Sequence, residues 1–137
     1  MFAYDFPHRK SAEGLLRLAS EGVIPDLVLA APHKNLKVRP SLVPGAMSST
    51  HPLHPRDVSR VLGISYQSIF HEDSMALLHP MGAKLGLVLG ARILPMEVVE
   101  LFEHGVMNIH PGLLPLNRGL DSVKHAINHR IPQGVTV

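Results

Sequence analysis

The chain has 137 residues, of which 45% are hydrophobic and 18% are charged, as expected for one globular domain. Its 13 basic and 11 acidic side chains give a formal net charge of +2 and form no basic stripe, which argues against a nucleic-acid partner. No apolar stretch is long enough to cross a bilayer, no secretory signal is visible, and cysteine is absent. We therefore expect a cytoplasmic protein with no membrane partner.

The ten histidines raise the question of a metal site. His51 and His54 lie in a proline-rich segment, and the others are scattered without a cluster of carboxylates. This spacing does not match a zinc site. We predict no metal site, although ligands distant in sequence could still converge in the fold.

The first third of the chain predicts two strands around one helix. Residues 2–4 are a candidate strand, and the helix that follows is expected to have Ser11 as its N-cap and to end at Gly22. The apolar run 27–31 predicts a second, buried strand. Repeated prolines over residues 33–54 predict a long loop.

The loop between the first strand and the first helix carries a mixture of charges. Asp5, His8, Arg9 and Lys10 all lie in it. A helix N-terminus with positive charge nearby could hold a phosphate group. An ordinary solvated loop explains the same residues.

Strands and helices continue to alternate after the long loop. Helices are predicted to start at Pro55 and Pro95, because proline suits the first turn of a helix. A short helix is expected over residues 72–78 and a longer one after Gly119. The inward-facing residues predicted for this last helix are Leu120, Val123 and Ile127. Further strands are predicted at residues 64–69, 85–90, 106–109 and 133–137.

This alternation predicts an α/β, Rossmann-like fold with a mostly parallel sheet and helices on both faces. No Gly-x-Gly-x-x-Gly follows the first strand, so a dinucleotide-binding function lacks its main support.

Residues 106–115 carry the strongest functional pattern. Their apolar start predicts a strand buried on both faces, and alternation along that strand points Asn108 and His110 to one side at its C-terminal end. Ligands of open α/β sheets bind at that end. An amide donor beside an imidazole can stabilise and protonate an oxyanion. A turn-capping asparagine and a structural histidine would fit the same short pattern.

The longer run is far more specific than this pair of residues. It reads Asn108-Ile109-His110-Pro111-Gly112-Leu113-Leu114-Pro115, and Arg118-Gly119 follows it. This run resembles the signature of the folate-dependent formyltransferases. The segment Gly90-Ala91-Arg92-Ile93-Leu94-Pro95 is similar to a second part of that family, and the resemblance covers about residues 85–137.

The resemblance implies transfer of a formyl group from 10-formyltetrahydrofolate to an amine. It assigns catalytic roles to Asn108 and protonated His110, and it assigns a wall of the donor's pterin pocket to Arg92, Ile93 and Leu94. Ordinary core packing would explain Ile93 and Leu94 equally well. A methionyl-tRNA acceptor is disfavoured because the chain has no basic surface or second domain. We expect a small-molecule amine, such as that of a sugar nucleotide.

Two other functions stay open: a hydrolase that passes the formyl group to water, and a non-catalytic ligand-binding domain. In the family an aspartate further along the chain charges the histidine. We therefore expect residues 1–137 to be a single formyltransferase-type domain, incomplete at its C-terminus and a poor catalyst alone. Asp121 and Asp73 are the nearest substitutes, although Asp121 is expected to cap a helix. An unpaired last strand would favour homodimers or aggregates.

Overall fold

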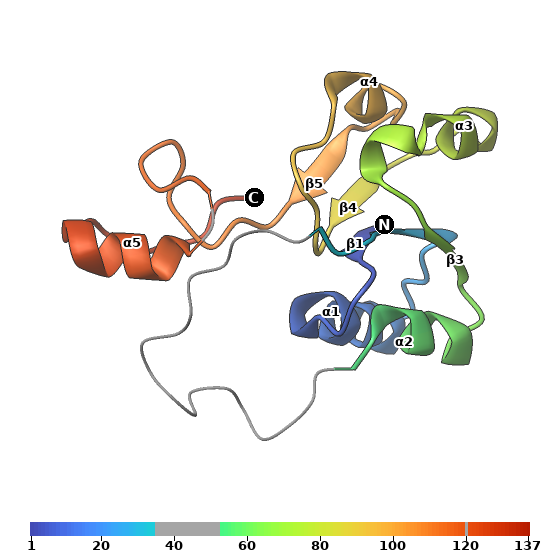
Figure 1. Cartoon of the computed structure of the whole chain (residues 1–137), viewed down its shortest axis with the longest axis horizontal. Coiled ribbons are helices and arrows are strands. Elements are labelled where there is room, and N and C mark those ends of the chain that lie inside the picture. Colours follow the sequence, from blue (N-terminus) through green and yellow to red (C-terminus); the bar gives the residue numbers. More distant parts are fainter. Residues whose placement is uncertain (35–52, 120) are drawn as a thin grey trace.

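The computed structural model describes residues 1–34, 53–119 and 121–137, so most of the predicted long loop and Leu120 lie outside the described residues (Figure 1). The longest helix of this part of the chain has 12 residues, too short and too polar to span a membrane. The elements, in chain order, are β1 (Phe2–Tyr4), α1 (Arg9–Ser20), β2 (Leu27–Ala31), α2 (Pro55–Val61), β3 (Ser65–Ser68), η1 (His71–Asp73), α3 (Met75–Leu78), η2 (His79–Met81), β4 (Gly86–Val88), α4 (Met96–Val99), β5 (Val106–Asn108) and α5 (Ser122–His129).

The five strands form one parallel sheet in the order β3-β2-β1-β4-β5. This arrangement confirms the predicted Rossmann-like α/β fold. The chain first builds outward from β1 through β2 to β3, and then returns to the other side of β1 to add β4 and β5. The strand order therefore reverses between β1 and β4, and ligands of such sheets bind outside the carboxyl ends of the strands at that point.

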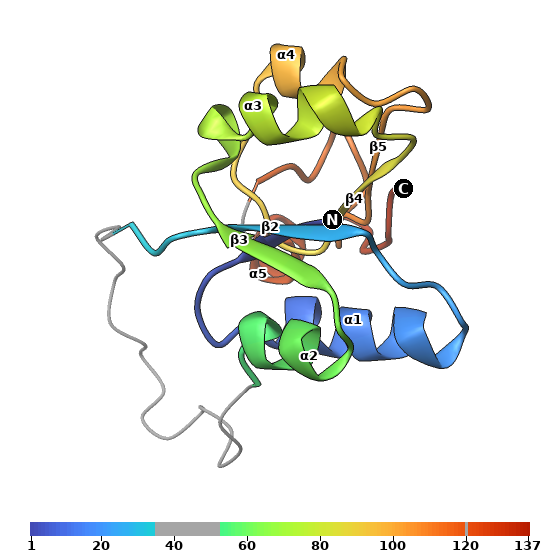
Figure 2. The same cartoon turned by 90° about the vertical axis from the view of Figure 1, so that its right-hand side faces the viewer.

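Each face of the sheet packs against its own pair of helices. Helices α1 and α2 cover one face, while α3 and α4 cover the other (Figure 2). Successive residues of β1 show the alternation, because Ala3 packs in the core beneath α1 and Phe2 in the core beneath α4. Both side chains are fully buried. Double burial likewise explains why β2 is a continuous apolar run.

The first helix begins earlier than the sequence predicted. Its N-cap is His8, whose Nδ1 accepts a hydrogen bond from the backbone N–H of Ser11 at 3.3 Å. Ser11 lies inside the first turn, fully buried, with its hydroxyl 2.6 Å from the His8 ring. The prediction of Ser11 as the cap was wrong because an imidazole acceptor three residues upstream took that role. Gly22 follows the helix with φ +76°, as the predicted stop requires.

The last quarter of the chain is more exposed than predicted. Strand β5 has Met107 43% exposed, so it is not buried on both faces. Helix α5 buries Ser122 and Ala126 and leaves Val123 and Ile127 in solvent. The buried face is therefore rotated by one residue, about 100°, from the predicted one. Residues 133–137 form only an antiparallel bridge from Thr136 to His110.

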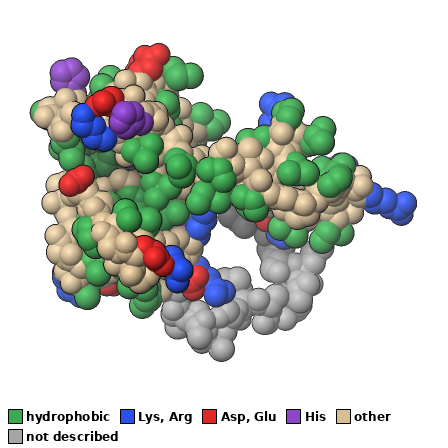
Figure 3. Space-filling view, turned by 180° about the vertical axis from the view of Figure 1, so that it is seen from behind, with side chains coloured by type: hydrophobic (Ala, Val, Ile, Leu, Met, Phe, Trp, Pro, Cys, Tyr) green, Lys and Arg blue, Asp and Glu red, His purple; other side chains and the backbone are tan. Residues whose placement is uncertain are grey.

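Exposed apolar side chains are frequent in this part of the molecule. Helix α5 projects beyond the end of β5 (Figure 1), and hydrophobic side chains cover both this projection and the body (Figure 3). The exposed large residues are Met107, Ile109, Leu114, Leu116, Val123, Ile127, Val135 and Val137. The predicted self-association, through an unpaired last strand carrying Val135 and Val137, stays a prediction.

His71 is a polar side chain inside the core beneath α4. The ring is 1% exposed, stacks edge-on against Phe2 at 5.1 Å, and has Nε2 3.3 Å from the carbonyl oxygen of Leu29. Among the described residues no partner contacts Nδ1. Burial lowers the pKa of His71 below that of a free histidine. The folded state therefore favours the neutral ring.

We predict that His71 makes the fold sensitive to mild acid. Below the ordinary histidine pKa of about 6.5, the unfolded chain takes up a proton that the folded ring resists, so the free energy of unfolding falls as pH falls. Urea denaturation between pH 7.5 and 5.5 should show a smaller fall for His71→Met than for the wild type. His104→Met, at an exposed position, is the control and should keep the wild-type slope. Equal slopes in all three proteins would contradict this account.

Candidate active site

Three chain segments meet at the point where the strand order reverses. They are the loop after β1, the loop after β4 and the end of β5. The hydroxyl of Tyr4 donates to the carbonyl of Ala91 at 2.8 Å, and Lys10 Nζ donates to the carbonyl of Ile109 at 2.8 Å. Residues distant in sequence are thereby joined at the C-terminal edge of the sheet, where the fold class favours a ligand site.

Asn108 is the last residue of β5 and pairs in register with Val88 of β4. The residue is exposed, so its amide is free to reach a ligand oxygen at this edge. An amide group offers two donor hydrogens in a planar geometry. That Asn108 shares one cleft with His110 stays a prediction.

His110 is half-buried and held on several sides. Its backbone N–H donates to Thr136 at 2.8 Å and its carbonyl accepts from Thr136 at 3.0 Å. Its Nε2 lies 2.7 Å from the carbonyl oxygen of Asn117 and 3.4 Å from the Ser122 hydroxyl. A carbonyl oxygen only accepts, so the hydrogen sits on Nε2. Nδ1 is then the ring nitrogen left for proton exchange with a ligand.

Asn117 is a site residue that sequence reasoning missed. It is 2% exposed, its Nδ2 donates to the Ser122 carbonyl at 2.7 Å, and its backbone N–H donates to Leu113 at 2.8 Å. A Cβ on Gly112 would lie 2.5 Å from the Asn117 carbonyl oxygen, so only glycine allows this approach. The Pro-Gly break thus permits the contact that orients His110.

The three residues expected to line a donor pocket have different surroundings. Arg92 donates to the carbonyl of Pro32 at 2.9 Å and its guanidinium lies 5.6 Å from the centre of the Phe70 ring. Leu94 packs against the core beneath α4, whereas Ile93 is 95% exposed. Core packing therefore accounts for Leu94, and Ile93 presents a free apolar side chain.

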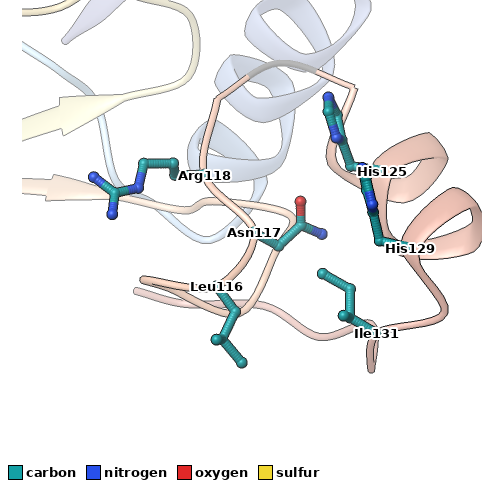
Figure 4. A pocket seen from close by; sticks show the side chains of 6 residues that line it. All are labelled: Leu116, Asn117, Arg118, His125, His129 and Ile131. Atoms are coloured by element: carbon teal, nitrogen blue, oxygen red, sulfur yellow. The ribbon is translucent and has the colours of Figure 1, made fainter.

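A surface cavity lies beside the His110 segment. Its volume is about 320 Å³, and Figure 4 shows the imidazoles of His125 and His129 along α5 with Asn117 opposite them. The two imidazoles are stacked with centroids 5.6 Å apart. The side chain of Arg118 points away from α5 in this view. The predicted site residues Asn108 and His110 do not line this cavity.

Within the described residues, the candidate carboxylates Asp121 and Asp73 do not contact the His110 ring. Asp121 occupies the N-cap position of α5, but its side chain makes no cap hydrogen bond and instead lies 2.9 Å from Lys124 Nζ. Asp73 belongs to η1, on the other half of the sheet. The described residues contain no group of three or more histidine, cysteine or acidic side chains suited to a metal ion.

Asp5 forms a second polar cluster at the same edge of the sheet. Arg56 Nη2 contacts both carboxylate oxygens, at 2.7 and 2.8 Å, the Tyr66 hydroxyl donates at 2.8 Å, and the Ser68 hydroxyl also donates. Burial alone would raise the pKa of Asp5, but the hydrogen bonds from Ser68 and Tyr66 and the charge of Arg56 lower it. This cluster ties the end of β1 to α2 and β3.

We predict that Asp5→Asn lowers the free energy of unfolding by about 2 kcal/mol, the scale of hydrogen bonds to a charged group. Because the pKa of Asp5 is lowered, the stabilisation is present above its unfolded pKa and is lost as pH falls through the folded value. Urea denaturation at pH 7 and pH 3 should show the difference from wild type shrinking in acid. Asp73→Asn, at an exposed position, is the control. A difference that does not depend on pH would refute the electrostatic origin.

Comparison with known proteins identifies relatives of this chain. A family model described as formyl transferase matches residues 49–137. A methionyl-tRNA formyltransferase from Thermotoga neapolitana is 34% identical over 76 residues, which are 54% of this chain and 24% of that protein. The chain therefore spans about a quarter of that relative.

Two solved structures share the fold. They are glycinamide ribonucleotide transformylase 1 from Symbiobacterium toebii, with a TM-score of 0.67 and 17% identity, and phosphoribosylglycinamide formyltransferase from Bacillus halodurans, with a TM-score of 0.66 and 19% identity. Each alignment covers 98% of this chain, but only 62% of the first structure and 68% of the second.

Proposed function

Because the chain belongs to the formyl transferase family, we propose that it moves a formyl group from 10-formyltetrahydrofolate to an amine of a small molecule. The observation that carries the proposal is the position of Asn108 and His110. Both lie within the residues that match the family model, at the C-terminal end of β5 in the fold. This is the edge where an open α/β sheet binds its ligands.

The residues present fit a folate donor. The exposed amide of Asn108 can donate to a formyl oxygen. Ile93, 95% exposed in the loop after β4, offers an apolar surface to a flat ring. When bound, the donor supplies an activated formyl group.

In the proposed reaction the acceptor nitrogen attacks the formyl carbon, a C–N bond forms, and an electron pair moves to the formyl oxygen. Asn108 donates a hydrogen bond to that oxygen as negative charge develops. Protonated His110 carries a hydrogen on both ring nitrogens. Its Nε2–H is directed at the Asn117 carbonyl, and its Nδ1–H protonates the formyl oxygen, which returns this proton to the ring when the carbonyl re-forms. When the carbonyl re-forms, the bond to the donor nitrogen breaks, that nitrogen takes up a proton, and the acceptor loses one. Each hydrogen-bond donor contributes about 3 kcal/mol.

His110 has a neutral partner in place of a carboxylate. The Asn117 carbonyl fixes the ring at 2.7 Å, but a neutral oxygen stabilises an imidazolium less than an anionic one does. We therefore expect turnover by residues 1–137 to be slow. A substitution that places a carboxylate beside the His110 ring should accelerate it.

The acceptor is proposed to be a small amine such as the amino group of a sugar nucleotide. His8, the N-cap of α1, and Arg9, the first residue of that helix, provide hydrogen-bonding and cationic groups at the same edge of the sheet. An anionic acceptor could meet them at the start of α1. We further propose a cytoplasmic location, where folate donors and nucleotide sugars are both available.

The proposal is tested by binding first and turnover second. Calorimetry with a stable 10-formylfolate analogue should show one site, and addition of amino-sugar nucleotides with 10-formyltetrahydrofolate should yield tetrahydrofolate and a formamide. Formate without an amine would identify a hydrolase instead. Binding of the folate analogue without turnover would identify a binding domain. Absence of analogue binding would overturn the proposed formyltransferase function.

We predict that Asn108→Ala reduces kcat by about 100-fold or more, since removal of one oxyanion donor commonly has that effect. Folding should be intact because the residue is exposed, which circular dichroism and thermal melting would check. Asn128→Ala, at an exposed position in α5, is the matched control and should retain wild-type kcat. Equal kcat for both variants would remove Asn108 from the mechanism.

A further inference from the structure

Lys10 joins the first helix to the centre of the candidate site. It is the second residue of α1, and its Nζ donates at 2.8 Å to the carbonyl oxygen of Ile109, which lies 99 positions later in the chain. Ile109 stands between Asn108 and His110. The lysine therefore contacts the carbonyl of the Ile109–His110 peptide, one of the two peptide groups that link the proposed catalytic residues.

The Ile109 carbonyl lies beyond the end of the parallel ladder. The pairing of β4 with β5 ends at Val88 and Asn108. The next residues of the β4 chain turn toward β1, since the N–H groups of Leu89 and Gly90 both donate to Phe2, at 3.1 and 3.2 Å. The carbonyl is thus open to a side-chain donor, although at this exposed position water could also satisfy it. Lys10 supplies that donor.

The remaining sides of this segment are held by other contacts. Thr136 pairs with the backbone of His110, and the Asn117 carbonyl accepts from its ring. Both contacts come from the chain that follows His110. Lys10 comes instead from α1, so its contact fixes residues 108–110 to the helix that packs on the sheet.

Helix α1, which carries Lys10, is packed tightly against the body of the protein. Its Ser11, Ala12 and Leu15 are buried. A Cβ on Gly90 would lie 2.8 Å from the Tyr4 ring and 2.9 Å from the Ser11 hydroxyl, so the β1–α1 connection packs directly on the loop after β4. Partial burial lowers the pKa of Lys10, and burial followed by the charge of Lys10 lowers the pKa of His8. Lys10 itself is exposed, and its ammonium group spans from α1 to the backbone that follows β5.

We propose that Lys10 is a positioning residue, which orients Asn108 and His110 by binding the carbonyl between them. The inference rests on the proposed function for its catalytic consequence. The orientation of the two side chains can be tested without an activity assay, because it can be observed in the protein alone. The role differs from charge neutralisation of a bound substrate, which would act on KM.

The test compares Lys10→Met, which keeps the stem and removes the donor, with Lys10→Arg, which keeps a cationic donor. Lys84→Met is the surface control, since Lys84 pairs with Glu103 on an exposed part of the fold. In isotope-labelled protein without ligand, we expect Lys10→Met to shift the Ile109 carbonyl carbon, the Asn108 side-chain amide and the His110 ring resonances. Lys10→Arg should restore them in part, and Lys84→Met should leave them unchanged.

In the formyl-transfer assay, Lys10→Met should reduce kcat by about 10- to 100-fold, the scale of a misplaced catalytic group, with donor KM within about twofold of the wild type. Lys10→Arg should recover most of kcat. Unchanged resonances of Asn108 and His110 in Lys10→Met would overturn the inference even if the wild type proves inactive. Shifted resonances with unchanged kcat, or a change confined to KM, would overturn the positioning role while leaving the proposed function intact.

Discussion

The central place of β1 in the sheet is the constraint on which the other features depend. This strand of three residues pairs in parallel with β2 on one side and β4 on the other. Phe2 and Ala3 point into opposite cores, so both layers of helices are anchored through neighbouring residues. Because every strand is parallel, all carboxyl ends meet at one edge. The proposed site at that edge follows from this topology.

Polar side chains from the end of β1 to the start of α1 connect β1 to both of the outer strands, β3 and β5. Toward β3, Asp5 accepts from Arg56, Tyr66 and Ser68. Toward β5, Tyr4 and Lys10 donate to the carbonyls that follow β4 and β5. The first ten residues therefore connect both halves of the sheet where the strand order reverses. This explains how a segment outside the region matched by the family model, residues 49–137, can influence the site.

Most elements of the described fold could be predicted from local pattern. Strand β2 was predicted at its observed bounds, and Pro55 begins α2 as expected. The errors occur where burial depends on what packs outside the element. Val61 is 80% exposed, whereas Val58, three positions earlier in the same helix, is buried. In α5 the small residues Ser122 and Ala126 are buried, and the Ser122 carbonyl accepts a hydrogen bond from Asn117 of the preceding loop.

The sequence alone determined the class of the fold, the alternation of strands with helices, and the motif that carries Asn108 and His110. These features are written in windows of about ten residues, where side-chain periodicity and glycine or proline breaks act directly. Only the tertiary structure decided that Nε2 of His110 faces the Asn117 carbonyl and that Lys10 reaches Ile109. The physical reason is that such contacts depend on loop geometry and helix packing across many residues, and hydrogen-bonding groups in a sequence do not reveal which partner they will meet.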